Sequence, residues 1–554
     1  MTARSGGRRR VARMVAVGSL LAAAVLLPRT PTGAADGGRM PLGPDDLVTQ
    51  YGETRTLAPG VTYQTMTQGT SDGHWTVWAQ RNKTETFGSK AAAEAFAAQL
   101  ADEGFSGVVD AFTAPAAADG AGGLFGYGVR VGVFPTDRKA SADRLAGWLR
   151  TADTAEADFD ARVIYSAMDG DAGTGPWKVH VVRVAPSAAV TFKAVHGTDV
   201  SSAETVRSMA TASGALAAVN GTEFDIHTLS GFSNYEGVPQ GLYVQDNVLL
   251  SAANNGRTAL LLEGAGARAR IAEVTSSVQV TAPNGDVRVL DGVNRVPGGV
   301  LGCGGVGGDQ LSMNGVLTQT DRPWRNQLCT DDSEIVVFRP EWGAKTPGPR
   351  KEVTISVDVV MNGNWVVQQI RSPAGGAIPA GGRVLQGIGE GADWLTRHAT
   401  VGATFKPGAS IKDMSGASVT SPTLSAVAGG GPALVRGGEV FLNTKANGMT
   451  NFAYGPNSTL VQRHPRSMAG ATASGELLLV TVDGRDPAVS VGVSWPEAAE
   501  VMKWLGATDA VGLGSGGDAT MVVAGELANS PMDDWGAQPS ERKVSTAVVV
   551  VPKA

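Results

Sequence analysis

Charge, cysteine and long apolar runs are all scarce in this sequence of 554 residues. Charged residues make up 18% of the chain, and 46 basic against 52 acidic side chains give a formal net charge of −6. No long basic run occurs beyond the first residues, so the electrostatic pattern of a nucleic-acid-binding protein is absent. No later stretch is apolar and long enough to span a bilayer as a helix. We therefore expect no nucleic-acid partner, and no transmembrane segment once the N-terminal signal is removed.

The N-terminus has the three parts of an export signal. Residues 4–13 (RSGGRRRVAR) are basic, residues 14–27 (MVAVGSLLAAAVLL) are apolar, and residues 31–35 (PTGAA) offer small side chains for cleavage. The apolar run is shorter than the roughly 20 residues that cross a bilayer as a helix. We predict a signal peptide over residues 1–36 and a secreted or cell-wall-associated protein, with an uncleaved anchor as the alternative.

The chain has two cysteines, Cys303 and Cys329, within a glycine-rich insertion. No cluster of cysteine or histidine surrounds them, which argues against a zinc site. In an exported protein a single pair most simply forms one disulfide, and closing a loop of this length contributes about 3–4 kcal/mol in the chain-entropy model. We predict a Cys303–Cys329 disulfide, no specific metal site and no cofactor.

The sequence pattern of residues 37–170 predicts a linker followed by a small domain. Residues 37–70 are polar and turn-rich without strong periodicity, so they are interpreted as a linker or irregular segment. In residues 71–170, strand-like segments alternate with two helices in the order β-α-β-β-α-β, which is a ferredoxin-like unit. The first helix is predicted from Ser89, as N-cap, to Gly104. The second is predicted to bury one face that holds Leu145, Trp148 and Leu149.

Residues 75–168 resemble the SPOR (sporulation-related repeat) family. The resemblance rests on "WTV" at residues 75–77 and on "FGSKAAAEAFAAQLADEGFSGVV" at residues 87–109. It implies that this unit binds the glycan strands of peptidoglycan. The motif is short and apolar, so a shared fold without glycan binding is the alternative.

A glycine-rich stretch near the C-terminus, "AVGLGSGGDATM" at residues 510–521, formally contains G-x-G-x-x-G. A dinucleotide fingerprint needs a strand before the glycines and a helix after them. Here a helix with a capping box at Ser494 and Glu497 comes before them, and a strand-like segment follows. Ser515 also lacks the G-x-S-x-G context of a nucleophile elbow, because Leu513 stands two residues before it. We expect a loop between helix and strand whose backbone N–H groups approach a ligand, with an ordinary tight connection as the alternative.

Residues 175–551 resemble the phosphodiester glycosidase family. The most specific matches are Asn220-Gly221, the segment 463–466 (RHPR), the segment 483–485 (DGR) and the glycine stretch. The expected fold class is therefore α+β, with the ferredoxin-like unit followed by a larger mixed sheet-and-helix phosphodiester glycosidase domain over residues 174–554.

The family resemblance implies hydrolysis of a sugar linked through its anomeric carbon to a phosphodiester. A phosphate monoester is a good leaving group, so cationic stabilisation of the phosphate and a carboxylate facing the sugar cation matter most. The partner would be a glycan or a phosphodiester-linked sugar. The catalytic candidates are Glu223, Arg466, Asp483, Arg485 and Asp518. The substrate-binding candidates are Asn220, Gly221, Arg463, His464, Ser515, Gly516, Gly517 and Thr520.

Several candidates also have structural interpretations. Arg466 and Asp483 can pair to hold two strands together, and Asp225 more readily caps a turn than catalyses. His464 and Asn220-Gly221 fit ordinary loop and turn roles. Asp483, Asp486 and Asp518 are carboxylates without the spacing of a cation site.

The sequence departs from the family pattern in the glycine stretch. The family usually has Asn-Leu-Asp-Gly-Gly-Gly-Ser-Thr-Thr-Met, whereas here Gly514 stands in place of Asp and Asp518 in place of Ser. Two accounts remain open. In the first, Asp518 or Glu223 replaces the missing carboxylate and the enzyme is active. In the second, catalysis is lost and the fold is kept as a glycan-binding module.

Overall fold

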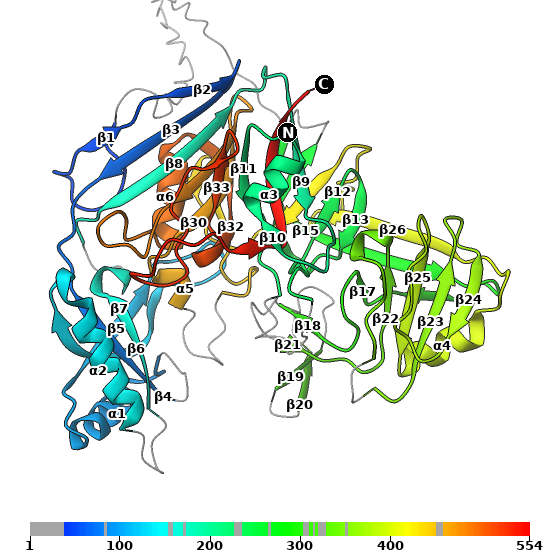
Figure 1. The fold of residues 1–554 in the computed structure, drawn as a ribbon, viewed down its shortest axis with the longest axis horizontal. Helices are drawn as coiled ribbons and strands as arrows, with labels where there is room; N and C mark the ends of the chain where they lie inside the picture. Colours follow the sequence, from blue (N-terminus) through cyan, green and yellow to red (C-terminus); the bar gives the residue numbers. More distant parts are fainter. Residues whose placement is uncertain are drawn as a thin grey trace, which may run out of the picture. The chain divides into compact units, whose positions relative to one another are not determined.

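The computed structural model is an α+β protein built almost entirely from antiparallel sheets (Figure 1). It describes residues 38–553 apart from residues 82–85, 153–158, 170–172, 226–234, 264–267, 303–309, 314–315, 320–327, 350–352 and 450–457. The predicted signal peptide lies outside the described residues. Within the described part, no helix combines the length and the apolar character needed to cross a membrane.

The largest sheet has nine strands and carries most of the candidate residues. In spatial order its strands are β1 (Thr49–Tyr51), β3 (Val61–Gln68), β8 (Trp177–Val184), β31 (Leu477–Val482), β30 (Arg466–Thr472), β32 (Ala507–Ser515), β28 (Ala433–Arg436) and β29 (Glu439–Val440), with β2 (Arg55–Ala58) paired to β3. Helix α6 (Trp495–Trp504) packs on β28 and β32. It has the predicted capping box at Ser494 and Glu497.

The prediction of a linker over residues 37–70 is wrong. This segment supplies β1, β2 and β3, and β3 pairs with β8 along its whole length (Figure 1). Val61 and Tyr63 turn toward one buried apolar cluster and Met66 toward another, while threonine and glutamine fill the positions between them. The apolar residues of this strand therefore do not keep a period of two, so the sequence pattern gives little sign of a strand.

Two further sheets pack with the nine-stranded one around a common apolar core that includes Val219, Leu260 and Leu479. The five-stranded sheet has the order β34 (Glu526–Leu527), β33 (Met521–Val523), β11 (Ala217–Asn220), β36 (Thr546–Pro552) and β9 (Val190–His196), with α3 (Val206–Ala212) packed on β11 and β36. The seven-stranded sheet has the order β13 (Val248–Ser251), β12 (Tyr243–Gln245), β27 (Ser425–Ala428), β14 (Arg257–Glu263), β15 (Arg268–Thr281) and β16 (Val287–Val289), with β26 (Lys406–Asp413) paired to β15.

The remaining elements form smaller groups. A second five-stranded sheet has the order β17 (Gly292–Val293), β22 (Ile335–Phe338), β25 (Arg383–Ile388), β23 (Ser356–Met361) and β24 (Val367–Arg371), with α4 (Glu390–His398) packed on β25 and β23. Three strand pairs are β10 (Glu204–Thr205) with β35 (Lys543–Val544), β18 (Val300–Leu301) with β21 (Leu328–Cys329), and β19 (Gln310–Met313) with β20 (Val316–Gln319). The short helical elements are α5 (Ser458–Val461), η2 (Thr136–Arg138), η3 (Ser166–Asp169), η4 (Pro340–Trp342) and η5 (Gly516–Asp518). Cys329 is buried, but Cys303 lies outside the described residues, so the disulfide stays a prediction.

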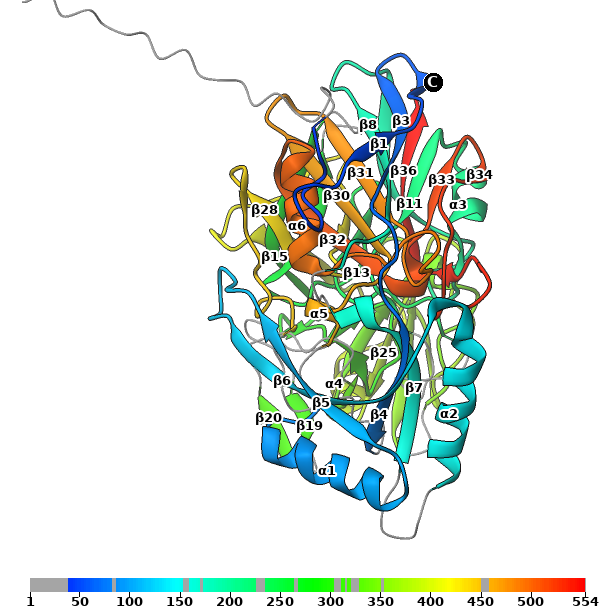
Figure 2. The same ribbon diagram turned by 90° about the vertical axis from the view of Figure 1, so that its left-hand side faces the viewer.

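The predicted βαββαβ order is confirmed. Its elements are β4 (Trp75–Arg81), α1 (Lys90–Asp102), β5 (Gly107–Ala114), β6 (Gly123–Phe134), α2 (Lys139–Thr151) and β7 (Phe159–Tyr165), and the sheet order is β5-β6-β4-β7 (Figure 2). The Ser89 hydroxyl caps α1, as predicted, by accepting from the Ala92 N–H. The prediction for Trp148 is wrong, because α2 buries Ala142, Ala146 and Leu149 and leaves Trp148 60% exposed.

The ferredoxin-like unit shares its apolar core with the nine-stranded sheet. One buried cluster contains Trp78 of β4 together with Trp177 of β8 and Trp495 of α6. The backbone adds to this contact, since the Ala118 N–H donates to the Leu442 carbonyl at 2.8 Å. The unit is therefore continuous with the rest of the protein, and the boundaries drawn at residues 170 and 174 stay predictions.

Candidate active site

The glycine stretch is part strand and part turn, where a loop was expected. Gly512 and Gly514 lie in β32, and Gly516 and Gly517 form η5, a single 3-10 turn that leads to β33. The strand continues through the first two glycines because β32 pairs with β30 as far as Ser515. The N–H of Gly516 is already bonded to the Pro465 carbonyl.

The two glycines of β32 make room for buried side chains. A Cβ at Gly512 would lie 2.5 Å from the Trp495 ring. A Cβ at Gly514 would lie 2.7 Å from Nδ2 of Asn220, which donates to the Gly514 carbonyl at 2.9 Å. Asn220 also accepts from the Thr520 N–H at 3.1 Å. Its amide thus fixes both ends of the glycine stretch.

The two glycines of η5 make room for arginines. A Cβ at Gly516 would lie 2.9 Å from Nη2 of Arg485, and a Cβ at Gly517 would clash with Oδ1 of Asp533 and lie 2.7 Å from the guanidinium carbon of its ion-pair partner, Arg542. Gly516 also has φ +71°, a backbone conformation that side chains other than glycine disfavour. The turn therefore lies against two cations.

Arg485 is held in an unusual backbone conformation beside this turn. Its φ is +63°, in the left-handed region that costs a non-glycine residue about 1 kcal/mol or more. Its Nε donates to Nδ1 of His464 at 3.3 Å, and its Nη1 donates to the carbonyls of Met532 and Asp533. Nη2, beside Gly516, makes no hydrogen bond within the described part of the chain.

Arg485 is a buried cation that the charges of Asp534 and Asp518 reach without a direct ion pair among the described residues. Burial, and then the charge of Arg162, lower its pKa to about 10, so the guanidinium is still protonated at neutral pH. Among the described residues no carboxylate lies within ion-pair distance of it. By contrast, Arg162 pairs with Asp534 at 3.1 Å, and Arg542 pairs with both Asp518 and Asp533.

Asp518 is the carboxylate nearest to the vacant side-chain position of Gly514. It is 6% exposed and accepts from Nη1 of Arg542 at 3.0 Å. Its Oδ2 lies 3.3 Å from where a Cβ at Gly514 would be. Burial lowers the pKa of Arg542, but the charges of Asp518 and Asp533 more than offset this and raise it. The guanidinium of Arg542 therefore lies between two carboxylates beside the turn.

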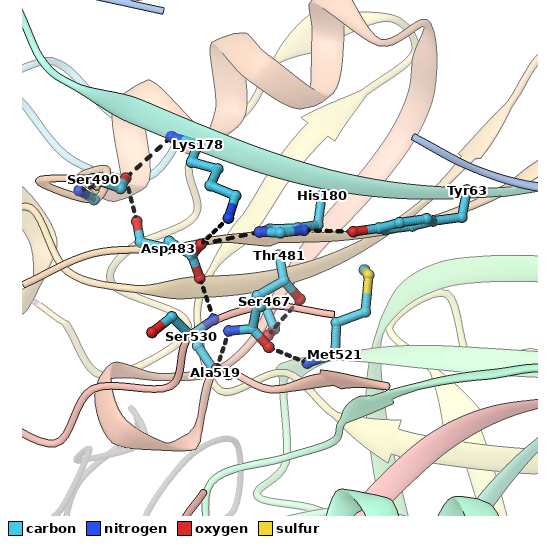
Figure 3. Close-up of polar contacts among 12 residues, drawn as sticks. Tyr63, Lys178, His180, Ser467, Thr481, Asp483, Ser490, Ala519, Met521 and Ser530 are labelled. Carbon is cyan, nitrogen blue, oxygen red and sulfur yellow. Dashed lines mark hydrogen bonds and ion pairs between the residues drawn. The ribbon is translucent and has the colours of Figure 1, made fainter. Parts of the chain in front are cut away.

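Asp483 belongs to a buried chain of side chains that links three strands (Figure 3). Its Oδ2 lies 3.0 Å from Nε2 of His180, whose Nδ1 lies 2.9 Å from the Tyr63 hydroxyl. Nζ of Lys178 lies 3.8 Å from the same carboxylate oxygen. A neutral imidazole satisfies this arrangement, with Nε2–H donating to Asp483 and Nδ1 accepting from Tyr63. Burial, then the charge of Asp483, raise the pKa of Tyr63 to about 12.

The other oxygen of Asp483 fixes the segment that carries the Arg485 contacts. Oδ1 accepts from the Ser530 N–H at 2.9 Å (Figure 3). The preceding residue, Asn529, accepts from the Met521 N–H and donates to the Ala519 carbonyl. One oxygen of Asp483 therefore contacts His180 and the other accepts from this segment, so Asp483 can hold residues 529–533 in position.

Arg463 and Arg466 are enclosed by other partners. Arg463 forms an ion pair with Glu497 at 2.6 Å and donates to the Ala167 carbonyl at 3.1 Å. Arg466 is fully buried, 4.1 Å from the Trp495 ring centroid, and donates to the carbonyls of Val493 and Gln462. These contacts favour structural roles, and no ion pair joins Arg466 to Asp483. Their catalytic and binding roles stay predictions.

The remaining candidates fall into two places. Gly221 and Thr520 join Asn220 at the glycine stretch, where the Gly221 carbonyl accepts from the Gly514 N–H at 2.8 Å. Glu223 is buried and lies 3.7 Å from Nη2 of Arg257. Glu223 therefore has its own cationic neighbour, separate from the contacts of Asp518.

Sequence reasoning missed Arg542, Asp533, Arg162, His180 and Tyr63. The one signal in the sequence for Arg542 and Asp533 was the pair of polar segments that follow the glycine stretch, "SPMDD" at residues 530–534 and "SERKV" at residues 540–544. Within the described residues, no group of three or more His, Cys, Asp or Glu is arranged to hold a metal ion.

Comparisons with known proteins cover both the family and the fold. Residues 356–551 match the family model of phosphodiester glycosidase. The crystal structure of a candidate exported protein from Burkholderia pseudomallei K96243 is 30% identical, with a TM-score of 0.80, and the match covers 94% of this chain and 100% of that one. A hypothetical protein from Synechocystis, 15% identical, has a TM-score of 0.50 over 91% of this chain and 80% of that one. No curated protein matches.

The catalytic domain of zebrafish N-acetylglucosamine-1-phosphodiester alpha-N-acetylglucosaminidase, auto-inhibited by its pro-peptide, is also among the matches. It is 14% identical, with a TM-score of 0.31, over 68% of this chain and 77% of that chain. The matched family segment contains His464, Asp483, Arg485, Asp518 and Arg542. Asn220 and Glu223 lie before it.

Proposed function

This chain belongs to the same family as the Burkholderia pseudomallei protein, and we propose that its phosphodiester glycosidase part hydrolyses a sugar-1-phosphodiester bond. The products would be a free sugar and a phosphate monoester. The natural substrate class would be a glycan of the cell wall or extracellular space that contains glycosyl-phosphate linkages.

The observation that carries this proposal is that Arg485, beside η5, has no ion-pair partner among the described residues. Of the three arginines there, Arg162 and Arg542 have carboxylate partners, whereas Arg485 has none within the described residues. A phosphodiester carries one negative charge, which one guanidinium fork can bind through two hydrogen bonds. Nη2 of Arg485, beside Gly516, has no other acceptor among the described residues and is placed to supply such a bond.

Asp518 is our candidate for the carboxylate that stabilises the positive charge developing on the sugar. It lies next to the position that a side chain at Gly514 would occupy. Arg542 donates a hydrogen bond to it, and its low exposure strengthens its interaction with a nearby cation. In this account the carboxylate has moved by four residues in sequence and by only a few ångströms in space.

The test is release of free N-acetylglucosamine from an N-acetylglucosamine-1-phosphodiester by the protein without residues 1–36. We expect turnover by the native protein and a loss of about 10²–10³-fold in kcat for Asp518→Ala, the range seen when one preorganised electrostatic group is removed. Asp393→Ala, an exposed carboxylate on α4, is the matched control and should keep full activity. Full activity of Asp518→Ala would overturn the assignment of Asp518.

A catalytically inactive, glycan-binding protein is the second candidate, and the observation that favours it is Gly514 itself. Inactivity of the native protein, together with turnover by the double variant Gly514→Asp/Asp518→Ser, would establish this account. The double variant restores the family pattern at both positions.

We further propose that the ferredoxin-like unit is a SPOR-like module that holds the protein on peptidoglycan. Its shared core with the nine-stranded sheet means that the whole protein, rather than the isolated unit, is the proper test. The protein without residues 1–36 should co-sediment with purified peptidoglycan. If it stays in the supernatant, this targeting role is wrong.

A further inference from the structure

A cavity opens next to β11, at some distance along the chain from the glycine stretch. Its wall is formed by the segment after β11, the end of β13 and the strand β17, and it includes Asp225, Gln240, Asn254 and Asp291. Val238 and Val300 are among its apolar members. Asp225 lies four positions after Gly221, whose carbonyl accepts from the Gly514 N–H, so the cavity begins within about 14 Å of the glycine stretch.

Asn254 gives the cavity an unsatisfied acceptor. The residue is 8% exposed, and its Nδ2 donates to the Gly302 carbonyl, which fixes the orientation of the amide. Its Oδ1 has no hydrogen-bond partner in the described part of the chain. A buried acceptor without a partner is costly, so such groups in native proteins call for an explanation. Gly241, at φ +95°, makes room for this oxygen, since a Cβ there would lie 2.7 Å from it.

The charges of the cavity disfavour an anion. Its one arginine, Arg295, is neutralised by Glu334, which accepts from Nη1 at 2.8 Å and from the Gly298 N–H at 2.7 Å. The wall also holds the carboxyl groups of Asp225 and Asp291, and Oδ2 of Asp291 lies 3.8 Å from Nη2 of Arg288 and accepts from the Ile335 N–H at 2.7 Å. Among the described lining residues, no arginine without a carboxylate partner is present for a phosphate, whereas hydroxyl groups would meet acceptors.

We propose that this cavity is a subsite for an uncharged sugar residue. Its hydroxyls would donate to Oδ1 of Asn254 and to the carboxyl groups, and its C–H face would pack on Val238 and Val300. The proposal rests on the proposed function only in that this sugar would belong to the same glycan as the phosphodiester bound at Arg485. Arg485 would then bind the phosphate of the substrate through its charge, and the cavity would bind the sugar through its hydrogen-bond acceptors.

The experiment is saturation-transfer NMR on the protein without residues 1–36, with glucose, galactose and N-acetylglucosamine as probes and with putrescine and inorganic phosphate as comparison ligands. At least one of the neutral sugars should bind, and Asn254→Leu should weaken it about five- to tenfold, as expected for one lost hydrogen bond. Asn364→Leu makes the same change at an exposed turn and should bind like the native protein. If Asn254→Leu fails to fold, Asp225→Asn takes its place in the comparison.

Three results would overturn the proposal: no binding of any of these sugars, equal binding by the Asn254 or Asp225 variant, or binding of putrescine in place of sugar. These are distinguishable from failure of the proposed function. Sugar binding that depends on Asn254, in a protein that hydrolyses no phosphodiester, would remove the hydrolase proposal and leave the subsite. Hydrolysis that depends on Arg485, without sugar binding in the cavity, would do the reverse.

Discussion

Replacing Gly514 by aspartate restores the family residue but should destabilise this protein. The new Cβ would lie 2.7 Å from Nδ2 of Asn220, closer than a real Cβ contact permits. Asn220 is fully buried, and its amide is bonded at both ends, so moving it breaks a buried hydrogen bond at a cost of about 1–3 kcal/mol. The new carboxylate would also lie close to Asp518. Two such charges about 4 Å apart repel by about 1 kcal/mol in water and about 4 kcal/mol at an effective dielectric constant of 20.

The repulsion between the two carboxylates disappears when Asp518 is replaced by serine, whereas the clash with the Asn220 amide remains. We therefore expect Gly514→Asp to lower the free energy of unfolding by about 2–7 kcal/mol, and the double variant with Asp518→Ser to recover about 1–4 kcal/mol of this loss. Urea denaturation of the native protein, both single variants and the double variant closes the cycle. Additive effects within about 0.5 kcal/mol would show that positions 514 and 518 do not share the same space. The idea of a relocated carboxylate would then fail.

Three other predictions follow from the same contacts. Arg485→Gln should lower kcat/KM for the phosphodiester by about 10²–10³-fold and the free energy of unfolding by about 1–3 kcal/mol, because its buried hydrogen bonds are lost. Arg268→Gln, on an exposed ion pair, should change neither, and equal activity of both variants would remove Arg485 from the site. The raised pKa of Tyr63, about 12 against an ordinary 10, means that its contribution to stability is fully present below pH 10 and is lost as the pH rises through 12, because the unfolded chain releases the proton first. Tyr63→Phe should therefore flatten the alkaline loss of urea stability over this window, and an unchanged slope would contradict the assignment. Removing residues 38–70 should prevent soluble folding by uncovering β8, and a stable truncated protein would show that β3 is dispensable.

Local signals in the sequence were sufficient for the elements with strong periodicity. The ferredoxin-like order follows from two helices of clear 3.6-residue period, and α6 follows from its capping box. β3 was missed because threonine and glutamine occupy every position that does not face the core. Trp148 was misplaced because it stands at the margin of the buried face of α2, where one helical position decides between core and solvent.

For the site, the sequence identified residues but not their partners. Arg485 and Asp518 stand beside the glycine stretch, as their motifs suggested. The motif at residues 463–466 did not indicate the partners of its arginines, because Glu497 and Trp495 lie on α6, about 30 residues away. Arg542 was missed because its partner, Asp518, is known only from the structure. It has no motif of its own, and its role depends on a turn that brings it back to Asp518.

The four glycines of the stretch, three of which formally match a nucleotide fingerprint, have no single purpose. Gly512 admits the Trp495 ring, Gly514 admits the Asn220 amide, and Gly516 and Gly517 admit two arginines. Each glycine leaves room for a different neighbouring side chain. The spacing of the four glycines therefore follows from the alternation of β32 and the single 3-10 turn after it. It follows that substitutions at these glycines should differ in whether they first affect stability or ligand binding. At Gly512 and Gly514 they disturb packing beneath the site and should cost stability first, whereas at Gly516 and Gly517 they displace the cations and should cost phosphodiester binding first.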